Sequence, residues 1–284
     1  MVRAPSVRRR LVGKALRRYR ENLGYTLGDA ARMLDCDTSK ISRIETGDRG
    51  IRVRELRELL GEYGIGAEQQ DLLGTLADPR GAFGWSAAYA DILPGPWQDY
   101  LILETAAAKI SGYEAQRVPG LLQTRDYARA LAETDPFLED NAAREQAADA
   151  VVARQKAILF GARRAEIHLV LGEAALHQQV GSAKVMSDQL LSLARVAGGT
   201  GSATLQVLPF ESGAHAAVGD GSLAILQVTD APRLGLVHVG GIGGGVCLEG
   251  PRDLEVYAEA FDQLRAFALS PVQSGLLLRG LAGA

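Results

Sequence analysis

The chain has few cysteines and no long apolar run. Cys36 and Cys247 are the only cysteines among its 284 residues, and they lie too far apart in sequence to suggest a metal site. Reduced thiols in a cytoplasmic protein are the simplest interpretation, with Cys36 a small buried residue rather than a redox switch. No apolar stretch approaches the roughly 20 residues that span a bilayer, and the basic N-terminus lacks the apolar segment of a secretory signal. We therefore expect a cytoplasmic protein without membrane contact.

Patterns typical of catalysis are missing as well. No G-x-S-x-G segment occurs, and the glycines between positions 240 and 245 do not fit G-x-G-x-x-G. A glycine-rich hairpin loop is the better interpretation of those glycines. Paired metal spacing is absent from the four histidines, which are His168, His177, His215 and His238. The sequence thus predicts a protein that is not an enzyme and that uses neither a metal nor a cofactor.

The net charge of −3 is small, yet the two ends of the chain differ in sign. Residues 1–64 hold 15 Lys and Arg against 9 Asp and Glu, and the remainder holds 16 against 25. The first twenty residues carry eight basic residues and no acidic one. Such an arm is the electrostatic footprint of a phosphate contact, so we expect Arg8, Arg9 and Arg10 to bind the DNA backbone.

The stretch from Leu27 to Glu45 is the most informative part of this basic end. Its apolar residues recur at helical spacing and predict two short helices joined by a tight turn. Thr26 and Asp37 are suited to cap these helices, because their side-chain oxygens accept from free backbone N–H groups. The second helix carries five hydrogen-bond donors that no core needs, which are Thr38, Ser39, Lys40, Ser42 and Arg43. A short, capped helix of this kind fits the major groove of DNA, so we expect it to bind DNA.

Three more helices complete a compact all-α unit. Periodic apolar residues predict helices over 8–22, 53–63 and 68–76. The turn after residue 46 brings Arg49 and Arg52 to where they can flank a phosphate backbone. Pro and Gly then cluster at residues 78–81, which marks a boundary. Because 284 residues exceed one average domain, we expect a helix-turn-helix domain over 1–78 and a second domain over 79–284.

The caps, the apolar stripe and the glycine at position 47 resemble the XRE family of phage-repressor-type helix-turn-helix proteins. This resemblance implies a five-helix, phage-repressor-like fold in which residues just after the second helix's N-cap read base edges. Carried onto this chain, Thr38, Ser39 and Arg43 would read bases. Lys40 and Ser42 would contact the backbone or neighbouring edges. In that family the acidic residue matching Glu45 holds the fold rather than touching DNA.

Beyond residue 81 the pattern mixes helices with strands. Helical periods fall near 125–132, 140–160, 172–179, 184–197 and 254–269, and the segment 100–113 fits either a helix or an extended chain. Alternating apolar residues predict strands near 165–171, 204–208, 222–228 and 234–239. The last two should pair across a turn at 229–232. We expect a larger α+β domain with a small sheet.

This second domain is similar to the C-terminal domain joined to XRE-type helix-turn-helix units in regulators from high-GC filamentous bacteria. The matching segments are VPGLLQT at 118–124, Tyr127–Ala130, Arg154-Gln155, Glu173–Leu176, Gln206–Phe210 and Ala268–Pro271. The resemblance implies an antitoxin-like transcriptional regulator paired with a small partner protein encoded next door.

Two functions stay open at this point. The first is a sequence-specific transcription regulator whose larger domain forms a homodimer and binds the small protein partner. One short helix reads few bases, and two half-sites multiply the specificity. The alternative is a regulator gated by a small-molecule effector held in the aromatic-rich second domain. The candidate partner or ligand residues, each with a core or capping role as its alternative, are Trp85, Trp97, Pro119, Gly120, Leu121, Leu122, Gln123 and Thr124.

Overall fold

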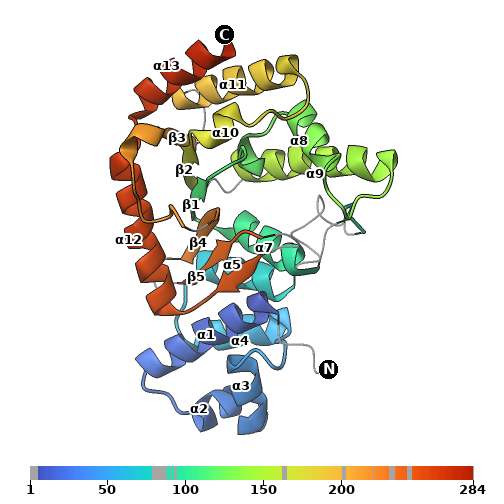
Figure 1. The fold of residues 1–284 in the computed structure, drawn as a ribbon. Helices are drawn as coiled ribbons and strands as arrows, with labels where there is room; N and C mark the ends of the chain where they lie inside the picture. The colour runs from blue at the N-terminus through green and yellow to red at the C-terminus, as the bar shows by residue number, and fades with distance from the viewer. Residues whose placement is uncertain are drawn as a thin grey trace.

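The computed structural model describes residues 6–78, 88–89, 91–92, 95–161, 165–199, 203–219, 221–229, 234–241 and 245–283. Figure 1 shows a helical unit at one end of the molecule and a larger part, built on a β-sheet, at the other. The expected fold class, a helical N-terminal unit followed by an α+β domain, is confirmed. Among the described residues, no helix combines the length and apolar character needed to cross a membrane.

The N-terminal unit contains the helices predicted for it. They are α1 (Val7–Asn22), α2 (Leu27–Met33), α3 (Thr38–Glu45), α4 (Val53–Glu62) and α5 (Ala67–Ala77). Both expected caps are present, because Thr26 accepts from the N–H of Asp29 at 3.2 Å and Asp37 accepts from that of Lys40 at 2.8 Å. These caps fix where α2 and α3 begin, and therefore the turn between them.

The C-terminal part is a six-stranded mixed sheet with helices on both faces. Its strands are β1 (Lys109–Glu114), β2 (Glu166–Gly172), β3 (Ala203–Leu208), β4 (Leu223–Thr229), β5 (Leu234–Val239) and β6 (Val246–Leu248). Its helices are α7 (Gly95–Ala106), η2 (Gly120–Leu122), α8 (Arg125–Ala132), α9 (Asn141–Leu159), α10 (Ala174–His177), α11 (Ala183–Ala197), η3 (Phe210–Ser212), α12 (Pro251–Phe267) and α13 (Pro271–Ala282).

The strands lie in the order β3-β2-β1-β4-β5-β6. β1, β2 and β3 run parallel, and their connections carry helices, as parallel neighbours require. β4, β5 and β6 add antiparallel strands, and the predicted pairing of the two segments now seen as β4 and β5 is confirmed.

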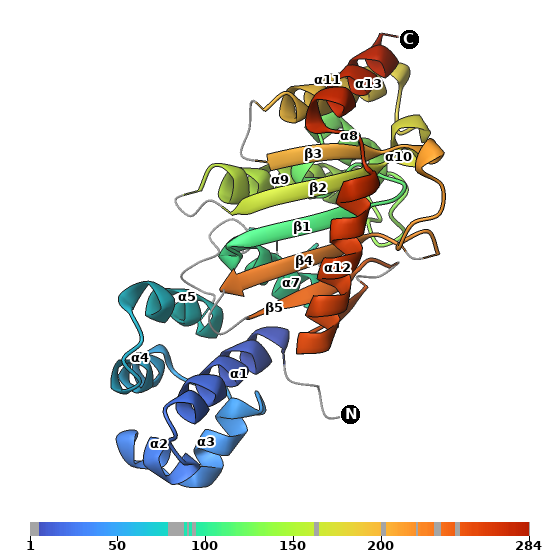
Figure 2. The same ribbon diagram turned by 90° about the vertical axis from the view of Figure 1, so that its left-hand side faces the viewer.

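The two faces of the sheet bury different sets of side chains. Figure 2 shows α12 lying across one face, where Phe261 and Leu264 pack with Val170, Ile225 and Val237. The alternate residues of the same strands point to the other face and pack beneath α7 and α11. Because helices cover both faces, side chains of either orientation are buried, and the strands therefore carry apolar residues at successive positions.

The structure differs from the sequence prediction in the size of the sheet and in its last elements. The segment 100–113 is neither all helix nor all strand, because α7 ends at Ala106 and β1 begins at Lys109. The intervening Ala108 already donates its N–H to the carbonyl of Gln227 on β4, at 2.8 Å. This long-range bond helps to start the strand, and local periodicity could not show it. The short β6 and the C-terminal α13 were also not predicted.

The helical unit docks against α7 and against β5, the strand next to the β6 edge of the sheet. In both views α1 and α5 lie nearest the larger part, whereas α2 and α3 lie toward the far end of the molecule. One buried apolar cluster runs through both parts and includes Leu11 and Leu76 as well as Leu103 and Leu236. The two parts therefore share a core.

Candidate DNA-binding surface

Helix α1 supports α3 from behind with almost no space between them. A Cβ added at Gly13 would lie 2.4 Å from the carbonyl oxygen of Ile44 and 2.6 Å from that of Glu45. Only glycine permits this approach of the two helices. Ile41 and Ile44 fill the inward face of α3, and both are fully buried.

A buried ion pair adds a second link between the same helices. Arg20 of α1 donates from Nε to Glu45 Oε1 at 2.6 Å and from Nη2 to Oε2 at 2.8 Å. It also donates to the carbonyl of Tyr25 at 2.7 Å. These hydrogen bonds with Glu45 raise the pKa of Arg20. Such two-point geometry fixes orientation as well as distance, and it agrees with the structural role expected of Glu45.

The outward face of α3 carries the residues predicted to read bases. Thr38, Ser39 and Arg43 are exposed, and Ser42 is half-buried. Arg43 donates to the carbonyl of Ser39 at 3.2 Å and to its hydroxyl at 3.3 Å. These contacts lie within α3 itself and are exposed, so the guanidinium is accessible to a base edge or a phosphate.

Lys40 is placed differently from the other predicted residues. Its ammonium donates to Glu55 Oε1 of α4 at 2.8 Å, and its side chain is only 15% exposed. Glu55 in turn accepts from the N–H of Arg52 at 3.5 Å. The structure therefore uses Lys40 to hold α3 against α4, and a DNA contact by this residue stays a prediction.

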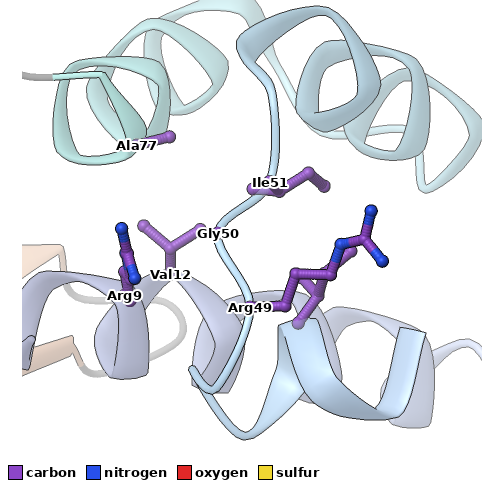
Figure 3. A pocket seen from close by; sticks show the side chains of 7 residues that line it. Arg9, Val12, Arg49, Gly50, Ile51 and Ala77 are labelled. Carbon is purple, nitrogen blue, oxygen red and sulfur yellow. The ribbon is translucent and has the colours of Figure 1, made fainter. Parts of the chain in front are cut away.

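The turn after α3 brings together cations from two elements. Figure 3 shows Arg9 of α1 and Arg49 of the turn on either side of Gly50, with Val12 and Ile51 between the helices. Arg9 and Arg49 are exposed, as is Arg52 at the start of α4. This arrangement is compatible with the predicted phosphate contacts of all three.

The other two arginines of the basic arm, Arg8 and Arg10, pair with carboxylates of the protein itself. Arg8 donates to Asp99 of α7 at 2.9 Å and to the carbonyl of Leu76 at 2.8 Å. Arg10 forms a multiply bonded ion pair with Glu249, which follows β6. Of the three arginines, the structure thus leaves Arg9 exposed and pairs Arg8 and Arg10 within the protein, and a DNA contact by these two stays a prediction. Arg8 and Arg10 lie at the junction between the two parts of the chain, and their partners are 91 and 239 residues away in sequence.

The PGLLQT segment lies inside the C-terminal domain. Leu121, Leu122 and Gln123 are buried, as is Pro119, whereas Gly120 and Thr124 are half-buried. Gln155 donates to the carbonyls of Gly120 and Gln123, each at 2.8 Å. Gln189 accepts from the N–H of Thr124 at 2.6 Å and donates to the carbonyl of Leu122 at 2.8 Å. Thr124 also caps α8. Side-chain amides thus hold this loop in place, which favours its structural interpretation over partner docking.

A buried ion pair that sequence reasoning did not identify lies behind this loop. Glu104 of α7 is 1% exposed and accepts from Arg154 of α9 twice, each time at 2.6 Å. Burial opposes the charge of Arg154, but Glu104 outweighs it and raises the pKa of that guanidinium. Tyr100 donates to Glu104 at 3.0 Å, and its ring contacts that of His238 in a tilted arrangement with centroids 4.7 Å apart. The pair locks α7 to α9, and the only signal in the sequence was the Arg154-Gln155 segment.

The predicted aromatic ligand site cannot be located on the described residues. Trp85 and the side chain of Trp97 lie outside them. Cys36 is half-buried in the turn between α2 and α3, where desolvation raises the pKa of its thiol. Burial likewise raises the pKa of Cys247 to about 11. High thiol pKa values disfavour the reactive thiolate at neutral pH.

Comparison with known families accounts for both parts of the chain. Residues 11–73 match a helix-turn-helix domain, which spans α2, α3 and α4 and most of α1 and α5. Residues 97–280, more than half of the chain, match a domain of unknown function, DUF5753. No match is found among curated proteins or among solved structures. The chain therefore belongs to the DUF5753 family and carries a helix-turn-helix domain at its N-terminus.

Proposed function

We propose that this protein is a sequence-specific DNA-binding transcriptional regulator in which α3 enters the major groove. The observation that carries the proposal is the contrast between the two faces of α3. Its inner face is fixed on α1 by Gly13 and by the Arg20–Glu45 pair. Its outer face presents exposed polar side chains, chiefly Ser39 and Arg43, whose hydrogen bonds are local ones to α3 and its N-cap Asp37. A rigidly held helix with accessible donors is what direct readout of base edges requires.

Arg9, Arg49 and Arg52 supply the phosphate contacts in this proposal. They are exposed beside the C-terminal end of α3 and the turn that follows it, so they would set the position of α3 on the duplex without reading sequence. Thr38 and Ser42 lie on the same helix and would contact neighbouring base or backbone atoms.

The proposed regulator works as a homodimer of the XRE, antitoxin-like type. A helix of eight residues, such as α3, contacts few base pairs, and two copies on adjacent half-sites multiply discrimination. The larger domain would form the dimer and bind a small protein partner, as the resemblance noted from the sequence implies. Regulation by a small-molecule effector stays an alternative prediction.

The first experiment is a binding titration with the full-length protein at several salt concentrations. A fragment of the protein's own promoter region is compared with a scrambled fragment of equal length. We expect preferential binding to the promoter fragment. In Arg43→Ala this preference should fall by about 1–3 kcal/mol at one base-pair position, because Arg43 is exposed on the outer face of α3.

The matched control is Arg57→Ala, which removes an exposed arginine of α4 that pairs with Asp71 at 3.0 Å. It should leave the preference unchanged. Equal, salt-sensitive binding of wild type to both fragments would reject sequence-specific recognition by the protein alone. Absence of binding to either fragment would reject the DNA-binding proposal altogether. Light scattering of the same sample tests the homodimer.

A further inference from the structure

The helical unit is held to the C-terminal domain by two carboxylates that accept hydrogen bonds from successive turns of α1. Asp99 of α7 accepts from the N–H of Val7 at 3.0 Å and from Arg8 Nε at 2.9 Å. A carboxylate at this position also meets the positive end of the α1 dipole. The first turn of α1 is thereby fixed to α7.

Glu249 accepts hydrogen bonds from the next turns of α1. It lies between β6 and α12, and its side chain is only 7% exposed. Arg10 Nε donates to its two oxygens at 3.0 and 3.2 Å, and Arg10 Nη2 makes a further, shorter bond. Lys14, one turn further along α1, donates to Glu249 Oε2 and to its carbonyl, both at 3.2 Å. We call the group formed by Arg8, Arg10, Lys14, Asp99 and Glu249 the α1 junction.

The α1 junction adjoins the support of the recognition helix. A Cβ added at Gly47, just beyond α3, would lie 2.9 Å from both the N and the Cα atoms of Arg10. Gly47 also has a φ of +82°, which other residues rarely adopt. Arg10 therefore touches the end of α3 with its backbone and holds Glu249 with its guanidinium. Gly13 and Arg20 extend the same tight contact along α3.

We propose that Glu249 and Asp99 are positioning residues through which the C-terminal domain fixes the placement of α3 for DNA recognition. This inference rests on the proposed function. Helix α1 is the rigid element between them, since α3 cannot shift on α1 without disturbing Gly13, Gly47 and the buried Arg20–Glu45 pair. A displacement of the β6–α12 connection would move α1, and α3 would move with it.

Positioning explains the junction better than masking of DNA-binding charge does. The cations of the junction face the larger domain, whereas α2 and α3 lie toward the far end of the molecule in both views. The shared apolar core continues beside the ion pairs, with Leu76 of α5 and Leu103 of α7 both buried in it. If the C-terminal domain only covered these cations and dissociated from them on DNA binding, the two parts would not be expected to share a buried apolar core. A fixed placement of α3 instead lowers the cost of ordering on binding.

The test combines a distance measurement with DNA binding in the full-length protein. Spin labels are attached at Arg32→Cys on α2 and Glu259→Cys on α12, both exposed positions, in a background with Cys36→Ala and Cys247→Ala. Glu249→Gln removes the charge with little change of shape, and Glu249→Arg places a third cation against Arg10 and Lys14. The distance distribution should broaden slightly in Glu249→Gln and clearly in Glu249→Arg.

Affinity for the promoter fragment should fall roughly threefold in Glu249→Gln and on the order of tenfold in Glu249→Arg, with little change for scrambled DNA. The double variant Arg10→Glu with Glu249→Arg should recover both the narrow distribution and most of the affinity. Glu211→Gln, an exposed carboxylate on η3, is the matched control and should change neither quantity.

Three results would overturn the inference. An unchanged distance distribution in Glu249→Arg would show that the junction does not place α1. A broadened distribution with unchanged promoter affinity would show that the placement does not matter for recognition. Higher affinity of both variants for both DNAs would show that Glu249 masks cations instead. A wild-type protein that does not prefer the promoter fragment would reject the proposed function, and the label distances would still report whether Glu249 holds α1.

Discussion

Two groups of cations in the helical unit carry the same charge but have different surroundings. Arg8 and Arg10 of α1 pair with carboxylates of the C-terminal domain. Arg43 of α3 and Arg49 of the turn after it are exposed. The basic character of the unit therefore does not by itself identify the residues that meet phosphates. What separates the two groups is the presence of a partner elsewhere in the fold, and each prediction below tests one side of that difference.

The largest effect is expected at Arg20, the buried cation that joins α1 to α3. Arg20→Ala would leave the carboxylate of Glu45 buried without its ion pair, because the two side chains are only 9% and 6% exposed. Removing one partner of a buried pair costs about 3–5 kcal/mol. Urea denaturation followed by circular dichroism should show a loss of this size, and hydrogen exchange should locate it in α1 and α3.

Arg18→Ala is the matched control, since Arg18 is an exposed arginine of the same helix. It should change stability by less than about 0.5 kcal/mol. A second check is Arg20→Met combined with Glu45→Leu, which should lose much less than Arg20→Ala because no buried charge remains unpaired. Equal losses in Arg20→Ala and Arg18→Ala would contradict a supporting role for the pair.

A smaller effect is expected at Arg49, on the exposed side of the comparison. Arg49→Ala should weaken binding to promoter and scrambled DNA alike, because a phosphate contact carries no sequence information. The slope of log affinity against log salt should fall in magnitude by about 1. Titrations at four salt concentrations measure both quantities.

Arg10→Ala offers the sharpest contrast with Arg49→Ala. Its guanidinium is held by Glu249, so the salt slope should stay close to that of wild type. Arg252→Ala, an exposed cation of α12, serves as the control for a general change in net charge. If Arg10→Ala lowered the slope as much as Arg49→Ala does, the division between paired and exposed cations would not hold.

Local patterns in the sequence predicted the elements well and their long-range partners poorly. Thr26 and Asp37 mark helix starts with their own side chains, so α2 and α3 could be placed from a few residues. The partners of Arg8 and Arg10 come from elements far along the chain, and no local pattern shows them. The same holds for Glu104, whose apolar neighbours on α7 gave no sign of the buried ion pair with Arg154.

The sheet shows where periodicity stops being informative. Buried strands alternate or run apolar whether their neighbours are parallel or antiparallel, so the sequence predicted β2, β3, β4 and β5 but not the order of the strands in the sheet. Ile167 and Leu169 face one side of the sheet and Val170 faces the other. The sequence alone could not assign these side chains to the two faces, because the assignment depends on α12, which covers the face of Val170. The C-terminal α13 begins with a serine cap at Ser270 followed by proline, a start signal that the prediction did not use.

The smallest effect is expected at Lys40, which lies on α3 yet belongs with the paired cations. Its hydrogen bond, followed by its charge, lowers the pKa of Glu55 below the ordinary value of 4.5. A carboxyl group with a lowered folded-state pKa stabilises the protein fully above its unfolded-state pKa and loses that contribution as the pH falls through the folded-state pKa. Lys40→Met should therefore lose about 0.5–1 kcal/mol of stability at pH 7. The difference from wild type should shrink as the pH falls from 5 toward 3, and urea denaturation across that range measures it.

Lys109→Met is the matched control, because its pair with Glu166 at 3.3 Å is far more exposed and should contribute little at any pH. A difference that stayed constant with pH, or a loss of promoter preference as large as that of Arg43→Ala, would place Lys40 with the exposed cations after all.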